Sequence, residues 1–115
     1  MSAQVAGAIF DRDVALSNVD GDAGLLKEIA ALFLGEYPTD LQMLRDAVAR
    51  GDAELAERTA HALKGSVSNF GARAARKAAS EIEDLGRARN LAEVAPALDQ
   101  LETALAALRR ELESL

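Results

Sequence analysis

The feature that most constrains this chain is an apolar stripe near its C-terminal end. Between residues 91 and 115, apolar residues recur at steps of three and four, which is the spacing of one face of an α-helix. The stripe consists of Leu91, Val94, Leu98, Leu101, Leu105, Leu108, Leu112 and Leu115. A face of this length is buried against other helices. We expect the helix to begin near Asn90, with Glu93 completing a capping box, and Pro96 to delay its start or kink it.

Helical periodicity of the same kind covers most of the preceding chain. Asp11, Asp22 and Asp52 stand where capping residues are preferred. The expected helices run from Asp11 to about residue 20, from Asp22 to Gly51, from Asp52 to Gly71, and from Ala72 to Gly86. Pro38 should kink or interrupt the second of them, because proline cannot donate a backbone hydrogen bond.

The connections between these helices are short, as in "RGD", "FGA" and "GRARN". Short loops between long amphipathic helices make neighbours antiparallel. We therefore expect an all-α fold, an antiparallel up-down four-helix bundle with a short additional N-terminal helix. Its 115 residues suit one domain, 1–115, and show no strand pattern.

Composition excludes several classes of function. The chain has no cysteine, so it can form neither a disulfide framework nor a thiolate metal site. A net charge of −6 argues against nucleic-acid binding. No apolar run approaches the roughly 20 residues of a membrane span, and the first residues do not resemble a signal peptide. We expect a cytoplasmic, monomeric protein without membrane contact.

The stretch "TAHALKGSVSNFGA", residues 59–72, contains His61, the only histidine in the chain. On a helix that turns 100° per residue, six polar residues or glycines fall within about 60° of His61. They are Glu54, Glu57, Arg58, Lys64, Gly65 and Ser68. The apolar residues lie opposite, so His61 should face solvent. An exposed bystander histidine remains open on this geometry alone, whereas Glu57 with His61 gives at most two metal ligands, too few for a metal site.

Gly65 and Lys64 favour a more specific interpretation. A glycine inside a helix costs about 1 kcal/mol relative to alanine, and here it removes a side chain one turn from the imidazole. A bulky partner could then approach the ring, and Lys64 adds a cation beside it. An exposed nucleophile with a cleared approach and an adjacent cation suits a histidine that carries a phosphoryl group.

These residues resemble the signature of histidine-containing phosphotransfer (HPt) domains. The stretch "HALKGSVSNFGA" has the family's histidine, an apolar residue two positions on, Lys-Gly, and Gly-Ala ten and eleven positions on. The segments "DGDAGLLKEIAALFL", "RGDAELAERTAHALKG" and "EIEDLGR" extend the resemblance over most of the chain. It implies an antiparallel four-helix bundle, often with a short N-terminal helix that covers one end.

The resemblance also implies roles for individual residues. His61 would accept a phosphoryl group on Nε2, Lys64 would offset its charge, and Gly65 would leave room for the partner. Glu83 stands where the family has a polar residue that hydrogen-bonds the other ring nitrogen. Three further residues are expected to border the site, namely Arg58, Ser68 and Arg87. Ser68 replaces a small residue that is often glycine in the family.

The implied function is a histidine phosphotransfer protein that shuttles a phosphoryl group between receiver-domain aspartates in a multistep two-component phosphorelay. The partners would be response-regulator receiver domains or a hybrid histidine kinase, and Mg²⁺ would belong to the receiver, so no cofactor is expected here. No P-loop or glycine-rich nucleotide loop is present, so no ATP-dependent kinase activity is expected. Two alternatives stay open: the phospho-accepting domain of a larger chemotaxis-type or hybrid kinase, and a helical interaction module that is not phosphorylated.

Overall fold

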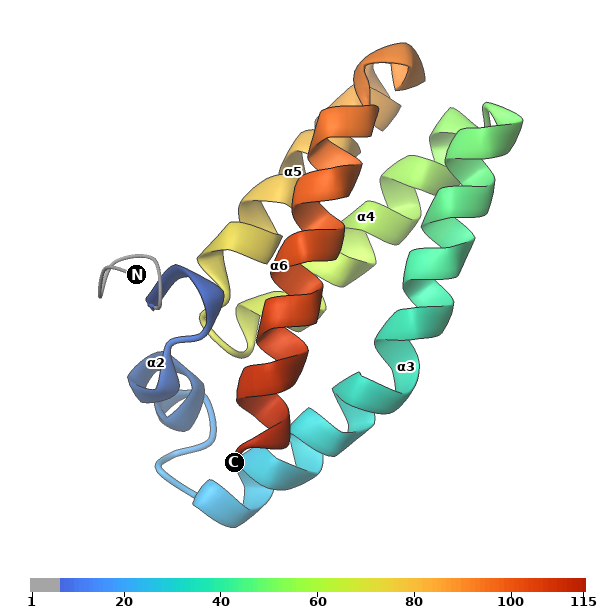
Figure 1. Cartoon of the computed structure of the whole chain (residues 1–115). Helices are drawn as coiled ribbons and strands as arrows, with labels where there is room; N and C mark the ends of the chain where they lie inside the picture. The colour runs from blue at the N-terminus through green and yellow to red at the C-terminus, as the bar shows by residue number, and fades with distance from the viewer. Residues whose placement is uncertain (1–6) are drawn as a thin grey trace.

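Four long helices alternate in direction around a common core (Figure 1). The computed structural model describes residues 7–115. Its elements are α2 (Arg12–Ser17), α3 (Ala23–Arg50), α4 (Ala53–Ser68), α5 (Arg73–Arg87), the 3₁₀ turn η1 (Leu91–Glu93) and α6 (Ala95–Glu113). Both α4 and α6 contact α3 and α5, which closes the bundle. No β-strand occurs among residues 7–115. The expected all-α bundle with a short N-terminal helix is confirmed.

The three predicted aspartate caps start their helices. Asp11, Asp22 and Asp52 each accept a hydrogen bond from the backbone N–H three residues on, at 3.2, 3.0 and 3.1 Å. Each bond satisfies a donor that the first helical turn leaves without a partner. At the other end of α3, Gly51 has a φ of 70°, the left-handed conformation that terminates a helix.

Pro38 bends α3 without ending it. The helix is continuous from Ala23 to Arg50 and changes direction near its middle (Figure 1). Proline removes one backbone hydrogen bond and crowds the preceding turn, which kinks a helix. Tyr37 and Leu41 are buried beside it, so packing holds both halves of α3 in the bundle.

The last helix starts later than a capping box at Asn90 would allow, and that prediction is wrong. Asn90 makes no side-chain capping bond, and residues 91–93 form a single 3₁₀ turn. The helix begins at Ala95, with Pro96 in its first turn. A proline is favourable there because the N–H it lacks would have no helical partner.

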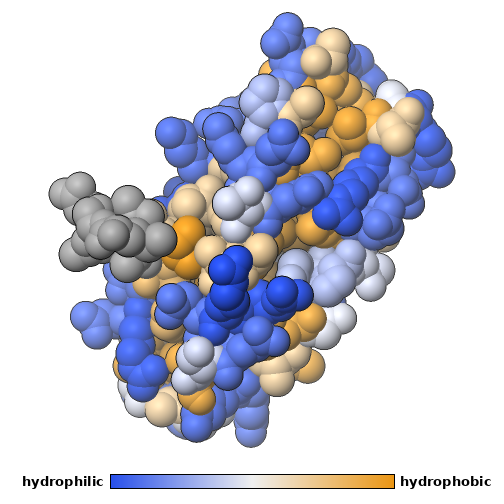
Figure 2. All heavy atoms as spheres, in the orientation of Figure 1, coloured by the Kyte–Doolittle hydropathy of each residue, from blue (hydrophilic) through white to orange (hydrophobic). Residues whose placement is uncertain are grey.

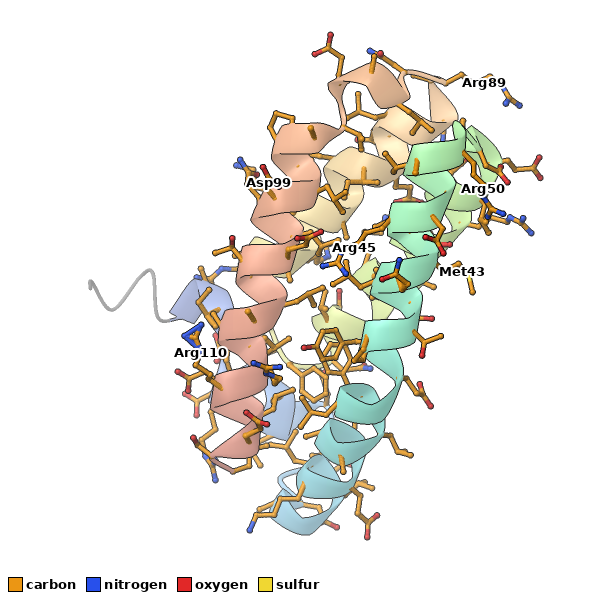
Figure 3. The ribbon with its side chains drawn as sticks, turned by 45° about the vertical axis from the view of Figure 1, so that its right-hand side comes forward. Met43, Arg45, Arg50, Arg89, Asp99 and Arg110 are labelled. Atoms are coloured by element: carbon orange, nitrogen blue, oxygen red, sulfur yellow. The ribbon has the colours of Figure 1, made fainter. Side chains whose placement is uncertain are left out.

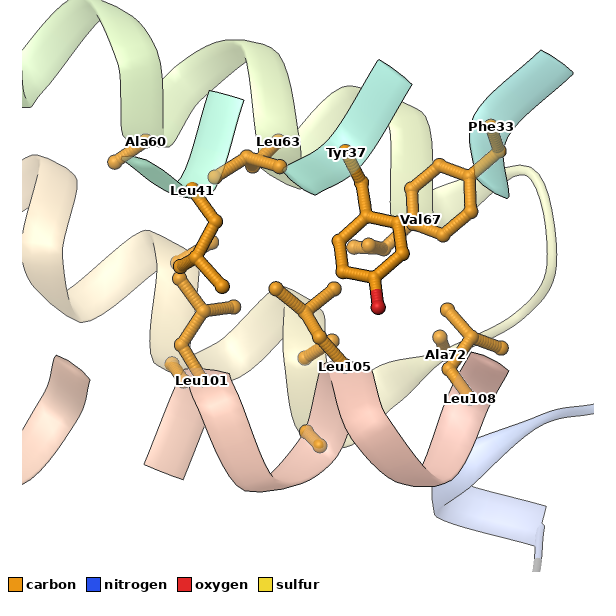
Figure 4. Packing of buried hydrophobic residues seen from close by; sticks show 14 of the residues in the cluster. Phe33, Tyr37, Leu41, Ala60, Leu63, Val67, Ala72, Leu101, Leu105 and Leu108 are labelled. Carbon is orange, nitrogen blue, oxygen red and sulfur yellow. The ribbon is translucent and has the colours of Figure 1, made fainter. Parts of the chain in front are cut away.

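The core lies between the four long helices. The apolar stripe of α6 is buried along its middle, with Leu101, Leu105 and Leu108 at most 1 % exposed. Leu105 and Leu108 lie on the side of Tyr37 and Phe33 of α3, and Leu101 lies beside Leu41 (Figure 4). Phe33 and Tyr37 stack with ring centroids 5.2 Å apart. Burying each such side chain contributes about 1.5–3 kcal/mol, so this contact fixes α6 against α3.

The short helix α2 holds the loop that follows α4. The Asp11 N–H donates to the Phe70 carbonyl at 3.1 Å, and the Asn18 side-chain amide donates to the Asn69 carbonyl at 3.1 Å. Gly71 in this loop has a φ of 59°, and a Cβ there would lie 2.7 Å from Asp11 Cβ. The glycine therefore permits both the turn and the close contact with α2.

Hydrophilic residues cover most of the face seen in Figure 2, with apolar residues showing between the helices. On α3, Arg45 points toward α6 (Figure 3), where its Nε donates to Glu102 Oε1 at 2.8 Å. Among residues 7–115, no helix has both the length and the apolar character needed to cross a bilayer.

Candidate functional site

His61 lies on the outer face of α4, as the helical wheel predicted. The opposite face of α4 is buried in the core by Ala56, Ala60, Leu63 and Val67. Because that face fixes the rotation of the helix, the imidazole must project outward, and 69 % of its side chain is exposed. The predicted exposure of His61 is confirmed.

A buried carboxylate from α5 meets this exposed ring. Glu83 is 5 % exposed, an unusual position for a glutamate unless its charge is paired. His61 Nδ1 lies 2.7 Å from Glu83 Oε2, and Lys64 Nζ donates to the other oxygen, Oε1, at 2.5 Å. Each carboxylate oxygen therefore has a donor, which offsets the cost of burying the charge.

The hydrogen bond from Lys64 lowers the pKa of the Glu83 carboxyl below its ordinary value. Burial acts in the opposite direction, and the hydrogen bond with His61 lowers the pKa further. The carboxyl is therefore ionised near neutral pH. Since an ionised carboxylate can only accept hydrogen bonds, the proton between the two groups belongs to Nδ1 of His61. The neutral ring then carries its free electron pair on Nε2, the nitrogen that faces away from Glu83.

Arg87 extends this pairing into a network between α4 and α5. Its Nη2 lies 3.4 Å from Glu83 Oε2, its Nε donates to Glu57 Oε2 at 3.2 Å, and its Nη1 donates to Asp84 Oδ1 at 3.3 Å. Glu57 belongs to α4 and the other three residues belong to α5. The guanidinium thus links the two helices one turn from His61.

Lys64, which was expected to place a cation beside the imidazole, is bound to the buried carboxylate instead of projecting freely into solvent. Its side chain is only 25 % exposed and its ammonium is held by Glu83. Gly65, in contrast, is exposed, and a Cβ added there would meet no atom within 4 Å. The fold itself does not require a glycine at this position.

The remaining predicted residues divide into two groups. Arg58 is exposed and lines an open hollow together with Glu54, Glu57, His61 and Glu83. Ser68 is half-buried, and its hydroxyl donates to the Lys64 carbonyl at 2.7 Å within α4. Arg58 therefore lies on the exposed surface beside His61, whereas the Ser68 hydroxyl is hydrogen-bonded inside its own helix. Within the part of the chain that the structure describes, no cluster of three potential ligands could hold a metal ion.

Gly86 is not the helix stop that the sequence pattern predicts. The helix α5 continues to Arg87, and the chain turns at Arg89, whose φ is 56°. Gly86 is buried between α5 and α4. Its position three residues after Glu83 was the available signal, since residues three apart share a helix face.

We predict that the buried carboxylate of Glu83 makes a pH-dependent contribution to the free energy of unfolding. Glu83→Gln should lower the free energy of unfolding near neutral pH by about 1–3 kcal/mol, the cost of losing a hydrogen bond between charged groups. Because the folded pKa of Glu83 is lowered, its contribution is complete above the unfolded pKa of about 4.3 and is lost as the pH falls through the folded value. Urea unfolding of both proteins from neutral pH to about pH 3 should show their difference shrinking in acid. A difference that stays constant into acid would contradict the ionised, paired carboxylate.

Comparison with known proteins places the chain in one family. The family model described as "Hpt domain" matches residues 28–111. The crystal structure of the HPT domain from an Hpt sensor hybrid histidine kinase of Shewanella superposes with a TM-score of 0.82 at 17 % identity, over 94 % of this chain and 93 % of that one. Histidine-containing phosphotransfer protein B (HptB) from Pseudomonas aeruginosa PAO1 gives a TM-score of 0.84 at 26 % identity, over 91 % of each chain. A comparison with curated proteins gives no significant match.

Proposed function

Because the chain belongs to the Hpt domain family, we propose that it carries a phosphoryl group on His61 between receiver-domain aspartates of a multistep two-component phosphorelay. The observation that carries this proposal is the pairing of an exposed imidazole with an ionised carboxylate at Nδ1. It leaves Nε2 unprotonated and directed outward, where another protein can reach it. The chain would act as a monomeric single domain.

The transfer follows from this arrangement. The Nε2 electron pair attacks the phosphorus of an aspartyl phosphate, a P–N bond forms, and the P–O bond to the aspartate breaks as its carboxylate leaves. The ring becomes positively charged as the bond forms, and the Glu83 carboxylate, 2.7 Å from Nδ1, offsets that charge. Catalysis then depends on positioning and charge stabilisation. Magnesium bound by the receiver would neutralise the phosphoryl oxygens during transfer.

Direct phosphotransfer tests the proposal. A set of receiver domains, phosphorylated with a small phosphodonor, is mixed with the purified chain, and the chain should acquire an acid-labile, alkali-stable label. The same chain incubated with ATP and Mg²⁺ alone should remain unlabelled. Stoichiometric labelling by ATP would instead indicate a kinase, and no labelling by any receiver would favour a helical interaction module that is not phosphorylated.

We expect the ammonium group of Lys64 to contribute to the rate of phosphoryl transfer. Lys64→Ala should slow transfer in both directions by about tenfold, less than the loss of a fully buried donor because a quarter of the side chain is exposed. The alanine removes a cation beside the developing charge and leaves Glu83 with one donor fewer. Stopped transfer reactions with a labelled receiver measure the rates, and titration calorimetry should show nearly unchanged receiver binding.

Lys64→Arg provides the matched control, because it retains the positive charge. It should recover a substantial part of the lost rate. Wild-type rates in Lys64→Ala would show that the ammonium serves only to pair Glu83 and takes no part in transfer.

A further inference from the structure

Gly86 permits a closer contact between α4 and α5 than a side chain at this position would allow. A Cβ built on Gly86 would lie 3.0 Å from the Ala53 carbonyl oxygen, 3.0 Å from the Glu57 nitrogen and 3.1 Å from Glu57 Cα. All three are main-chain atoms of α4, so they cannot move aside as a flexible side chain can. A methyl group at this position would have to push the two helices apart.

This contact lies one helical turn from the hydrogen bond between His61 and Glu83. Gly86 follows Glu83 by three residues on the same face of α5, and Glu57 precedes His61 by four residues on the same face of α4. Arg87, next to Gly86, also joins Glu57. The backbone contact and the ring–carboxylate bond therefore depend on the same separation between the helices.

Several of the buried residues on α4 and α5 are small, which is compatible with a close approach of the two helices. The buried residues of α4 include Ala53, Ala56 and Ala60, and those of α5 include Ala75 and Ala79. The distance between packed helices is set by the side chains at their contact. Because Gly86 meets main-chain atoms of α4, an added methyl group there would change the separation of the helices beside the site.

We propose that Gly86 is a positioning residue, which sets the separation of α4 and α5 at which Glu83 reaches Nδ1 of His61. A hydrogen bond of 2.7 Å weakens when its atoms move apart by the few tenths of an ångström that an added methyl group requires. Loosening it reduces the preference for the proton on Nδ1, and with it the preference for a free electron pair on Nε2. The consequence for phosphotransfer rests on the proposed function, whereas the consequence for the ring does not.

The test reads the ring directly. His61 is the only histidine, so ¹⁵N-detected correlations of its ring need no assignment. At a pH well above the titration of imidazole, the wild-type protein should show a protonated Nδ1 and an unprotonated Nε2. In Gly86→Ala the two nitrogen shifts should move toward each other, as the proton distributes over both positions. Wild-type shifts in a folded Gly86→Ala protein would overturn the proposal.

Gly35→Ala is the matched control. Gly35 also lies inside a helix, and a Cβ there would meet no atom within 4 Å, so the same substitution should leave the ring shifts unchanged. If Gly86→Ala does not fold alone, it is measured in the Gly35→Ala background, where the better helix former offsets part of the loss. Failure to fold in both backgrounds would show that Gly86 serves stability in general and would also overturn the positioning role.

Transfer rates separate this inference from the proposed function. Gly86→Ala should transfer about tenfold more slowly than wild type, the lower end of what losing such an orienting partner costs at metal sites. If wild-type protein accepts no phosphoryl group from any receiver, the proposed function fails, while the ring shifts still decide the role of Gly86. If wild type transfers and Gly86→Ala retains both its rate and its shifts, only the positioning role fails.

Discussion

Replacing His61 with glutamine is expected to abolish labelling by a phosphorylated receiver while leaving the helical content unchanged. An amide nitrogen is not nucleophilic, and the chain has no second histidine to take over. The substitution should also be tolerated by the fold, because most of the side chain faces solvent. The glutamine amide can donate to Glu83 in place of Nδ1–H, so the free energy of unfolding should fall by about 1 kcal/mol or less.

The control for this experiment is chemical as well as genetic. Label on wild type should be lost in acid and retained in alkali, which distinguishes phosphohistidine from an acyl phosphate or a phosphoserine. Circular dichroism and a thermal melt establish that His61→Gln is folded. Label that persists on the folded variant would place the accepting group elsewhere in the chain, and the proposed role of His61 would be wrong.

The exposure of His61 could be predicted because it depends on one helix alone. Once Leu63 and Val67 are assigned to the core, the 100° step of the helix fixes where every other residue of α4 points. The contact with Glu83 needed more than the wheel. Its position came from counting along the resemblance to the family, and the structure places it 2.7 Å from the ring.

Other features could not be predicted because they depend on two helices at once. Lys64 has a long, flexible side chain, and its sequence does not reveal that a carboxylate from α5 will hold it. The close approach at Gly86 depends on the distance between α4 and α5, which follows from every residue at their interface. The asparagine cap expected at Asn90 failed for a local reason, since Pro96 sets the helix start in its place. Sequence patterns thus predict the direction in which a residue points from its helix more readily than they predict which residue of another helix it contacts.

Gly65→Gln is expected to keep or raise the melting temperature and yet to slow phosphotransfer by about a hundredfold. Glutamine is a better helix former than glycine by up to about 1 kcal/mol, and a Cβ at Gly65 would meet no atom within 4 Å. The new side chain would stand one turn beyond His61 on the same exposed face of α4. It would meet the receiver as it approaches Nε2 in line, and a displacement of about 1 Å from the productive geometry is enough for a loss of this size.

The same substitution at Gly35 separates a steric effect at the site from the general effect of a longer side chain on a helix. Gly35 is an exposed glycine of α3, on the face turned away from the buried Phe33 and Tyr37. Gly35→Gln should raise stability as much as Gly65→Gln and leave transfer unchanged.

Gly65→Ala should have a transfer rate between those of wild type and Gly65→Gln, because its methyl group intrudes less. Wild-type transfer by Gly65→Gln would mean that the partner needs no space at this position. Unfolding of Gly65→Gln would mean that the glycine serves helix packing, contrary to the open space around it. The outcome expected from the structure is a more stable helix that reacts poorly, because the glycine one turn from His61 serves the approach of another protein.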